Sequence, residues 1–441
     1  MEKGVVLTSA TFPRARAGER MHALAAELFP ICRSITGNGV RATLRELGKR
    51  IPLELHEVAS GTQVLDWTIP EEWNIEDAYI ATSEGRRVVD FRASNLHVVG
   101  YSEPMRAKMT LAELRPFLHT HPHNPAWIPY RTSYYSRTWG FCLSDHQLSS
   151  FGEGPFEVVI DSTLEPGSLT YGELLLAGEK DTEVLLSTHI CHPSLANDNL
   201  SGIVLLAELA ATLADAPRRL SYRFLFIPGT IGSIAWLARN EQLTPRIAAG
   251  LVVACVGDAG PITYKRSRRG DALVDRAGAH VVAHAENGRI IDFVPWGWDE
   301  RQFNSPGFDL PVGGLTRSFE GEFPEYHSSA DNVELIHAER LEESLRAALA
   351  IVDVLEHDRV HVNLLPKGEP QLGKRGLYRG LGGADPGTQQ LALLWVLNQS
   401  DGMRSLLEIA DRSGIAFTDL ADAARDLVEA GLLAQHEWPS Q

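Results

Sequence analysis

The feature that most constrains this fold is an alternation of apolar strands and helices between about residues 170 and 360. The segments "EVLLSTH", "YRFLFIP" and "AGLVVACVGD" are almost continuously apolar, and helical patterns lie between and after them. Such strands are buried on both faces, because helices cover both sides of a mainly parallel sheet. The sequence therefore predicts an α/β fold in which helices sandwich a sheet.

The domain organisation follows from the length of 441 residues, which predicts two to four domains. We expect a discontinuous core made of residues 1–61 and 166–365. Between its two halves, residues 62–165 contain short β-type runs separated by Gly, Pro and Ser turns, which predicts an inserted β-rich domain. Residues 366–384 are rich in Gly, Pro and Lys and are predicted to be a linker. Three short helical patterns in residues 385–441 then predict a winged helix.

The charge of the chain argues against nucleic acid and anionic membranes as partners. The net charge is −16, whereas either partner would attract a cationic surface. The predicted winged helix has nine acidic residues and three arginines, a net of −6, and its segment "FTDLADAARDLVEAG" is itself acidic. We therefore expect a structural or protein-contact role for it, and the sequence leaves open whether the chain forms a homo-oligomer.

The sequence also predicts where the protein is located. The first twenty residues lack both the apolar centre and the small-residue cleavage site of a signal peptide. No run approaches the roughly 20 apolar residues of a membrane span. The four cysteines are widely spaced and form no CxxC pair, which is typical of reduced thiols in a cytoplasmic protein.

Four potential metal ligands follow strands or lie in polar loops. His189 ends one predicted strand, Asp198 lies in the loop after it, Asp258 ends another strand, and His327 lies in "EFPEYHSSAD". Each alone would more often be a hydrogen-bonded structural residue or a helix N-cap. Together they predict a metal site, because ligands collect at the carboxyl ends of the strands in open α/β sheets. Imidazole and carboxylate are zinc ligands, and the two oxygens of Asp198 could bridge two ions.

The order His189, "NDNLSG", strand-end Asp258 and "YHSSAD" resembles that of the co-catalytic zinc aminopeptidases. More closely, the chain resembles bacterial aminopeptidase-like proteins of polysaccharide biosynthesis clusters. The resemblance spans nearly the whole chain and rests on long motifs: "LFPICRSITGNGV", "DWTIPEEWNIEDAYI", "YRTSYYSRTWGFCLS", "THICHPSLANDNLSG", "YKRSRRGDALVDRA" and "WGWDERQFNSPGFDLPVG". It implies a zinc aminopeptidase-like mixed sheet sandwiched by helices, with an inserted β-rich domain and a C-terminal winged helix.

The resemblance also implies roles for individual residues. His189, Asp198 and Asp258 match one zinc position, with Asp198 bridging to a second position that includes His327. In zinc aminopeptidases two glutamates come after the next strand; one acts as general base and the other is a ligand to the second metal. This chain reads "FIPGTIGS" there, so Gly229 occupies the position where the close family keeps a glutamate.

Two functions therefore remain open. The first is a zinc-dependent hydrolase that acts on an amide bond of a small amino-bearing substrate or a peptide. The second is a metal-binding pseudoenzyme that binds a ligand or partner without hydrolysis, because removing a general base costs about 10²–10⁴ in rate. The candidate replacement bases are His192, Glu320, Glu322 and Glu325. The candidate substrate contacts are Arg301 and Tyr326.

Overall fold

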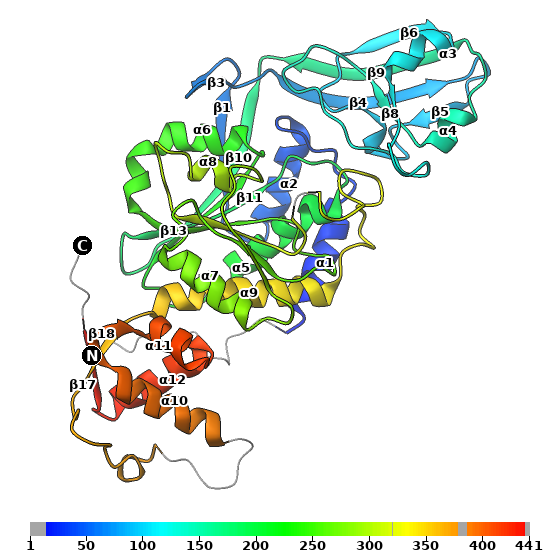
Figure 1. Cartoon of the computed structure of the whole chain (residues 1–441). Coiled ribbons are helices and arrows are strands. Elements are labelled where there is room, and N and C mark those ends of the chain that lie inside the picture. The colour runs from blue at the N-terminus through cyan, green and yellow to red at the C-terminus, as the bar shows by residue number, and fades with distance from the viewer. Residues whose placement is uncertain (1–14, 320, 378–385, 437–441) are drawn as a thin grey trace.

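The structure is a computed structural model of the chain, and it describes residues 15–319, 321–377 and 386–436. Three parts follow one another along the molecule: a small antiparallel sheet, a larger α/β part and a compact group of helices near the C-terminus (Figure 1). None of the helices within the described ranges is long and apolar enough to cross a membrane.

The larger part is built on a mixed eight-stranded sheet. Its spatial order is β1 (Glu54–Ala59), β10 (Ser168–Leu176), β12 (Ser221–Ile227), β11 (Glu183–His189), β13 (Ile247–Val253), β16 (Val312–Thr316), β14 (Thr263–Lys265) and β15 (Arg289–Ile291). Strands β12, β11, β13 and β16 are parallel. Strands β10 and β14 join this central group in antiparallel pairs with β12 and β16, and β1 pairs antiparallel with β10. All residues of β11 and β12 are buried, as expected for central strands covered on both faces.

Helices cover both faces of this sheet, which confirms the predicted sandwich. One face packs against α1 (Ala17–Leu28), α2 (Asn38–Gly48), α5 (Gly202–Ala214), α7 (Leu273–Ala283) and α9 (Ala338–His357). The opposite face packs against α6 (Ile231–Asn240) and α8 (Glu300–Phe303). Because side chains alternate along a strand, Leu186 and Phe224 join the first core while their neighbours Leu185 and Leu225 join the second.

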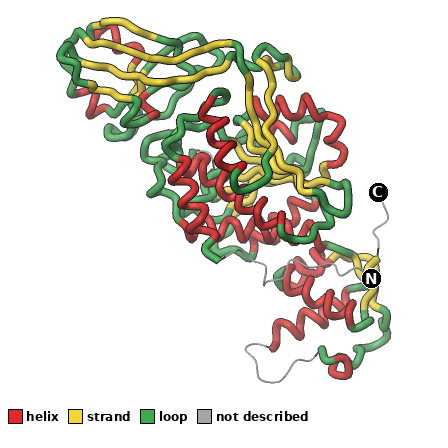
Figure 2. The backbone as a smooth tube through the Cα atoms, turned by 180° about the vertical axis from the view of Figure 1, so that it is seen from behind, coloured by secondary structure: helices red, strands yellow, loops and turns green. Residues whose placement is uncertain are grey.

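The small antiparallel sheet projects away from the larger one (Figure 2). Its order is β5 (Arg87–Asp90), β4 (Glu72–Ala81), β9 (Phe156–Glu165) and β6 (Met105–Met109). The connecting segments hold the short elements β2 (Gln63–Val64), β3 (Trp67–Thr68), α3 (Leu111–Leu114), β7 (Leu118–His119), β8 (Phe141–Cys142) and α4 (Asp145–Ser149). We call the segment from β4 to β9, residues 72–165, the insert. It lies inside the stretch predicted as an inserted domain, and the predicted boundaries themselves stay a prediction.

The C-terminal part is a winged helix. It contains α10 (Pro386–Gln399), α11 (Leu406–Ser413), α12 (Phe417–Glu429) and a sheet of β17 (Val360–Asn363), β18 (Asp401–Ser405) and β19 (Leu433–His436). Strand β17 precedes the predicted linker and pairs with both other strands, so this fold begins before residue 385. A strand of only four residues, directly after the long helix α9, gives too short a pattern to recognise in sequence.

Candidate metal centre

The first site residue, His189, is the last residue of β11 and is buried. Its strand pairs in parallel with β12 on one side and β13 on the other, so His189 lies at the carboxyl end of the sheet's centre. This is the edge where ligands of open α/β sheets collect. The chain then continues through Cys191 and His192 to an irregular π-helical turn at Ala196–Ser201, which leads into α5.

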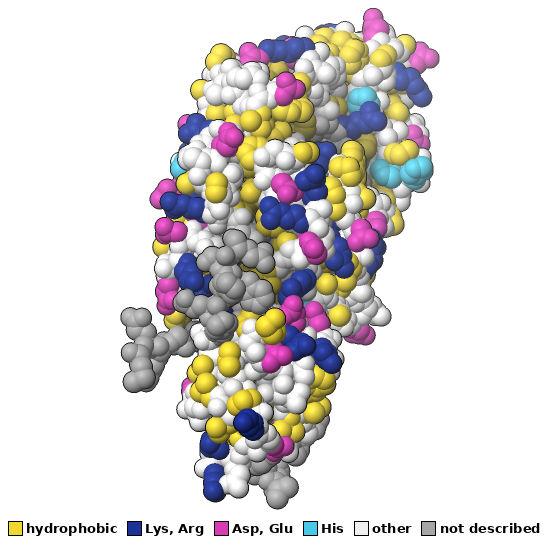
Figure 3. Space-filling view, turned by 60° about the vertical axis from the view of Figure 1, so that its left-hand side comes forward, with side chains coloured by type: hydrophobic (Ala, Val, Ile, Leu, Met, Phe, Trp, Pro, Cys, Tyr) yellow, Lys and Arg dark blue, Asp and Glu magenta, His cyan; other side chains and the backbone are white. Residues whose placement is uncertain are grey.

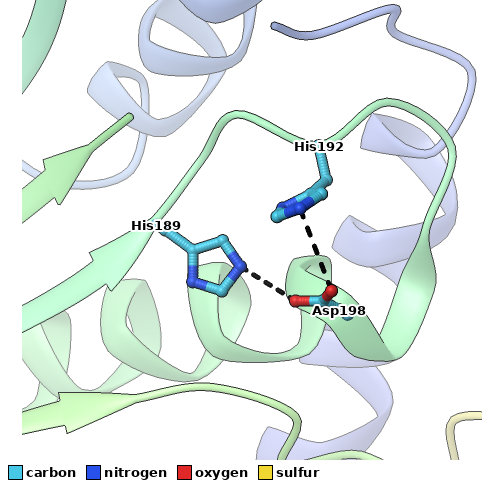
Figure 4. Close-up of side chains that lie close together, drawn as sticks. All are labelled: His189, His192 and Asp198. Carbon is cyan, nitrogen blue, oxygen red and sulfur yellow. Dashed lines mark hydrogen bonds and ion pairs between the residues drawn. The ribbon is translucent and has the colours of Figure 1, made fainter. Parts of the chain in front are cut away.

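Asp198 lies in that turn, fully buried, and both of its oxygens face imidazoles. The distance from His189 Nε2 to Asp198 Oδ1 is 2.9 Å, and the distance from His327 Nε2 to Asp198 Oδ2 is also 2.9 Å. His192 Nε2 lies 3.9 Å from Asp198 Oδ2. His189, His192 and Asp198 point toward one another (Figure 4), and one potential ligand atom from each lies within 4.8 Å of the others.

The electrostatics of this cluster favour the ligating form of each group. Burial opposes ionisation of Asp198, but the imidazoles of His192, His189 and His327 outweigh it and hold the pKa of the carboxyl well below its usual range. Burial lowers the pKa of His192 to about 3. At neutral pH the site therefore offers an ionised carboxylate beside a neutral imidazole, which are the protonation states that a metal ion requires.

The turn that carries Asp198 is fixed by a second buried carboxyl, that of Asp331. The backbone N–H groups of Ala196 and Asn197 donate to Asp331 Oδ1 at 3.1 and 2.6 Å, and the N–H of Asp198 donates to Oδ2 at 2.9 Å. Burial raises the pKa of Asp331 to about 8, while the N–H donors act in the opposite direction. Asp331 thus links the "SSAD" loop to the residue that both histidines face.

The amides on either side of Asp198 anchor the same turn to the sheet. The Asn197 side chain donates to Asp258 Oδ2 at 2.5 Å and accepts from the N–H of Gly257 at 3.0 Å. The Asn199 side chain donates to Thr188 Oγ1 at 2.8 Å and accepts from the N–H of Cys255 at 3.2 Å. These contacts explain why amides flank the single carboxylate of the "NDN" sequence.

Asp258 is not brought into the three-residue ligand group. Its Oδ2 accepts from Asn197, and its Oδ1 accepts from Ser318 Oγ at 2.9 Å and from the N–H of Gly260 at 2.6 Å. The third member of the group is instead His192, which the sequence suggested as a base. The assignment of Asp258 as a metal ligand stays a prediction, and the geometry adds His192 as a competing candidate.

The three glutamates proposed as replacement bases differ in position. Both oxygens of Glu322 are bonded by Arg289, at 2.6 and 2.9 Å, and the N–H of Phe319 donates to one of them at 3.1 Å. Glu322 is therefore engaged in an ion pair rather than available to the site. Glu325 is half-buried in the loop that carries His327, and its carbonyl accepts from Ser328. Glu320 lies outside the described residues.

Of the two proposed substrate contacts, Tyr326 stacks on the ring of His327, with centroids 4.0 Å apart and planes 12° apart. The Arg301 guanidinium lies 5.7 Å from the centre of the Trp296 ring. Trp296 is 60% exposed whereas Trp298 is 8% exposed. Only the second of these tryptophans therefore behaves as a core residue.

The position of the missing glutamate is occupied by backbone close to the site. The N–H of Gly229 donates to Cys191 Sγ at 3.2 Å, and a Cβ atom there would lie 3.3 Å from Cys191 Sγ and 3.4 Å from His189 Cβ. A side chain at residue 229 would thus start beside the first histidine. This contact is consistent with the alignment of Gly229 with a catalytic position.

Sequence reasoning missed a buried carboxyl, Asp299. Its Oδ1 accepts from Ser233 Oγ at 2.8 Å, and its Oδ2 has no hydrogen-bond partner among the described residues. Burial raises the pKa of Asp299 to about 6, and the charge of His189 acts in the opposite direction. The available signal was its place in the "WGWDERQF" motif, from which only Arg301 was selected.

Comparisons with known proteins identify the family of the chain. Residues 22–358 match the family described as "Domain of unknown function (DUF4910)", and residues 359–435 match a winged helix-turn-helix family. A Clostridium acetobutylicum protein, described as a polysaccharide biosynthesis protein with an aminopeptidase-like domain, is 51% identical over 421 residues, covering 95% of this chain and 97% of its own.

Solved structures show the fold. A crystal structure of a Clostridium acetobutylicum protein, described as a peptidase, has a TM-score of 0.91 at 50% identity and covers 96% of this chain and 97% of its own. A zinc aminopeptidase from Bacillus subtilis has a TM-score of 0.56 at 14% identity, covering 77% of this chain and 94% of its own. The chain therefore belongs to the DUF4910 family and is an aminopeptidase-like relative of the Clostridium polysaccharide biosynthesis protein, with a zinc aminopeptidase-type fold and a C-terminal winged helix.

Proposed function

We propose that the protein is a zinc-dependent, aminopeptidase-like hydrolase that cleaves an amide bond of a small amino-bearing substrate. The observation that carries the proposal is Asp198, whose two oxygens each lie 2.9 Å from a different imidazole nitrogen at the carboxyl end of the central strand. A buried carboxylate that faces two histidines in this way is suited to share metal ions between them.

The donor set fits zinc. His189, His192, Asp198 and His327 offer imidazole nitrogens and carboxylate oxygens, which are zinc ligands. We expect about one tightly held zinc per chain, because the second position lacks the carboxylate that Gly229 replaces. When bound, zinc acidifies water and polarises a carbonyl group.

The chain's own residues then position the reactants and move protons. His192 is half-buried, with its Nε2 3.9 Å from Asp198 Oδ2, and its pKa of about 3 leaves it neutral at neutral pH but makes it a weak base. Asp299 interacts with His189 and has one oxygen without a hydrogen-bond partner among the described residues; its pKa of about 6 is closer to neutral pH. We assign the role of the missing glutamate to one of these two groups.

The alternative is a metal-binding pseudoenzyme, and the specific observation in its favour is Gly229. Its N–H donates to Cys191 Sγ, and no residue between Arg223 and Arg239 is Asp or Glu. In that case the site would bind a ligand or partner without turnover. The winged helix would then serve as a contact module for the same partner.

The deciding experiment combines metal analysis with a substrate panel. Zinc per chain is measured by elemental analysis, and hydrolysis is tested on aminoacyl amides and, given the relative's description, on N-acylated amino sugars. Asp198→Asn should abolish both zinc binding and hydrolysis while retaining the fold, because Asn has nearly the same volume but is a much weaker ligand. If the wild-type protein cleaves nothing in the panel, yet a ligand raises its melting temperature, the result supports the pseudoenzyme and contradicts the hydrolase.

The matched control is Asp258→Asn, a second buried aspartate that contacts the same turn through Asn197. Loss of zinc in this variant would make Asp258 a ligand, as the family resemblance implies. Retained zinc, together with loss in His192→Asn, would identify His192 as the third ligand. If Asp198→Asn keeps its full zinc content, the proposed centre is misplaced.

A further inference from the structure

The insert reaches the candidate metal centre through one loop, residues 127–134. Pro129 forms an antiparallel bridge with Ser328. The N–H of Ile128 donates to Ser329 Oγ at 2.9 Å, and the N–H of Ser329 donates to the carbonyl of Ile128 at 2.8 Å. The N–H of Tyr130 donates to the carbonyl of His327 at 2.7 Å. The loop is therefore held by backbone pairing to the segment that carries a site histidine.

This pairing places the ring of Tyr130 against two site histidines. Its centroid lies 5.2 Å from that of His192, with the planes at 67°, and 5.1 Å from that of His327, with the planes at 88°. Both contacts are edge-to-face arrangements of the kind that aromatic rings favour. The ring thus packs against two of the imidazoles that lie close to Asp198.

Tyr130 is half-buried, and its hydroxyl group lies 3.2 Å from the hydroxyl of Tyr134, which belongs to the same loop. A tyrosine hydroxyl has an ordinary pKa of about 10, so it is protonated at neutral pH. Tyr130 can therefore act as a hydrogen-bond donor.

We propose that Tyr130 is a substrate-contacting residue of the candidate metal centre, supplied by the insert, which donates a hydrogen bond to the carbonyl oxygen of the scissile amide. When water adds to the carbonyl carbon, a new C–O bond forms and the π electrons of the C=O bond move to the carbonyl oxygen. Tyr130 stabilises the resulting negative charge without losing its own proton. The C–N bond then breaks as the electron pair returns, and the departing amine takes a proton that came from water.

This inference rests on the proposed function, and it explains why the insert is anchored beside Asp198. A donor aimed at charge that develops in the transition state contributes mainly to kcat, and removing one such donor costs about 10²–10³ in rate. A wall residue that only filled space would instead alter stability or the binding of all ligands equally.

The test compares Tyr130→Phe with the matched control Tyr134→Phe. Each variant removes one hydroxyl of the same pair and keeps the ring. For the amide that the wild-type protein cleaves, Tyr130→Phe should lower kcat about 10²–10³-fold at nearly unchanged KM, with zinc content and melting temperature retained. Tyr134→Phe should change kcat less than about threefold, because the proposed donor remains.

A binding measurement separates this inference from hydrolysis itself. Leucine hydroxamate, whose carbonyl oxygen can occupy the same position, is titrated into the zinc-loaded wild-type protein and both variants by calorimetry. Weaker binding only in Tyr130→Phe supports the contact even if no amide is cleaved, in which case the hydrolase proposal alone fails. If Tyr130→Phe keeps wild-type kcat and hydroxamate affinity, the inference is overturned. If the wild-type protein neither cleaves amides nor binds the hydroxamate, both proposals are overturned.

Discussion

Asp331 offers the sharpest test of how the site is organised. Its carboxylate accepts three backbone N–H groups in a row, from Ala196, Asn197 and Asp198, and it is fully buried. In Asp331→Asn an NH₂ group replaces one oxygen, so a donor must face at least one of these N–H groups. Because the pKa of Asp331 is about 8, its carboxyl is already largely uncharged at neutral pH, so the substitution removes a hydrogen-bond acceptor rather than a charge.

The magnitude follows from these contacts. A neutral hydrogen bond contributes about 0.5–1.5 kcal/mol, and a buried donor left unpaired costs about 1–3 kcal/mol in addition. We therefore expect Asp331→Asn to lower the free energy of unfolding by about 3 kcal/mol. If the turn that carries Asp198 must regain these contacts before zinc binds, the affinity for zinc falls by about 10²-fold, since 1.4 kcal/mol corresponds to a factor of ten.

The assay measures zinc affinity by competition with a chelator, alongside denaturant unfolding. The matched control is Asp275→Asn on α7, another fully buried carboxyl. It accepts from the N–H groups of Ser267 and Ala272, at 2.6 and 3.1 Å, and from Tyr264 Oη at 3.1 Å. The control should lose similar stability but keep its zinc affinity. Equal losses of zinc affinity in both variants, or none in Asp331→Asn, would refute the reasoning.

Three further outcomes are expected. Gly229→Glu should raise amidase turnover and second-metal affinity, since its Cβ fits beside Cys191 with a shift of a few tenths of an ångström; unchanged turnover and metal stoichiometry in a folded variant would contradict the alignment. The winged helix should not bind duplex DNA at physiological salt. Positive and negative side chains are interspersed on the face shown in Figure 3. The start of α12 packs on α7, where the N–H of Phe417 donates to His280 Nε2 at 3.0 Å. A gel shift of duplex DNA at submicromolar protein concentration would contradict this prediction. Burial lowers the pKa of His361 to about 4, so the unfolded state binds the proton first and stability should fall by about 3 kcal/mol as pH drops from 6.5 to 4. His361→Phe should flatten that part of the pH profile of unfolding, and an unchanged slope would count against a buried neutral imidazole.

The sandwich fold and the contact between His189 and Asp198 were accessible from sequence because they depend on local signals. Apolar strands set the sheet, and residues at the carboxyl ends of parallel strands or in the loops beyond them meet at one edge. His189 and Asp198 lie only nine residues apart, so the strand and the following turn determine their contact. The winged helix was predicted in the same way, from helix periodicity and length.

Asp258 shows where this reasoning stops. The strand before it ends at Val253, and four residues lie between that end and Asp258. Cys255 within this stretch has a positive φ of 51°, a conformation that redirects the chain and that a non-glycine residue rarely adopts. Strand periodicity therefore could not predict where Asp258 points, and its side chain bonds Asn197 and Ser318.

Tyr130 and Asp299 were missed for a different reason. Each lies in an irregular segment, and each reaches the site through contacts with residues far away in sequence, such as His327 and Ser233. Both lie in motifs that support the family resemblance, but the residues around them do not mark either as a site residue, because a tyrosine after a proline or an aspartate after a tryptophan occurs in many loops. Only the tertiary arrangement shows that the insert and α8 approach the same strand end.

Positive charge lies close to the candidate site. Arg33 is buried, and its guanidinium donates to the carbonyl oxygens of Leu28, His192 and Pro193 at 2.8, 2.7 and 3.0 Å. Burial lowers its pKa to about 10, so it remains charged at neutral pH. A bound divalent ion would add further positive charge next to Asp198. Positive charge favours a group that becomes negative during reaction, and a neutral donor such as Tyr130 can bind that group without adding a charge of its own.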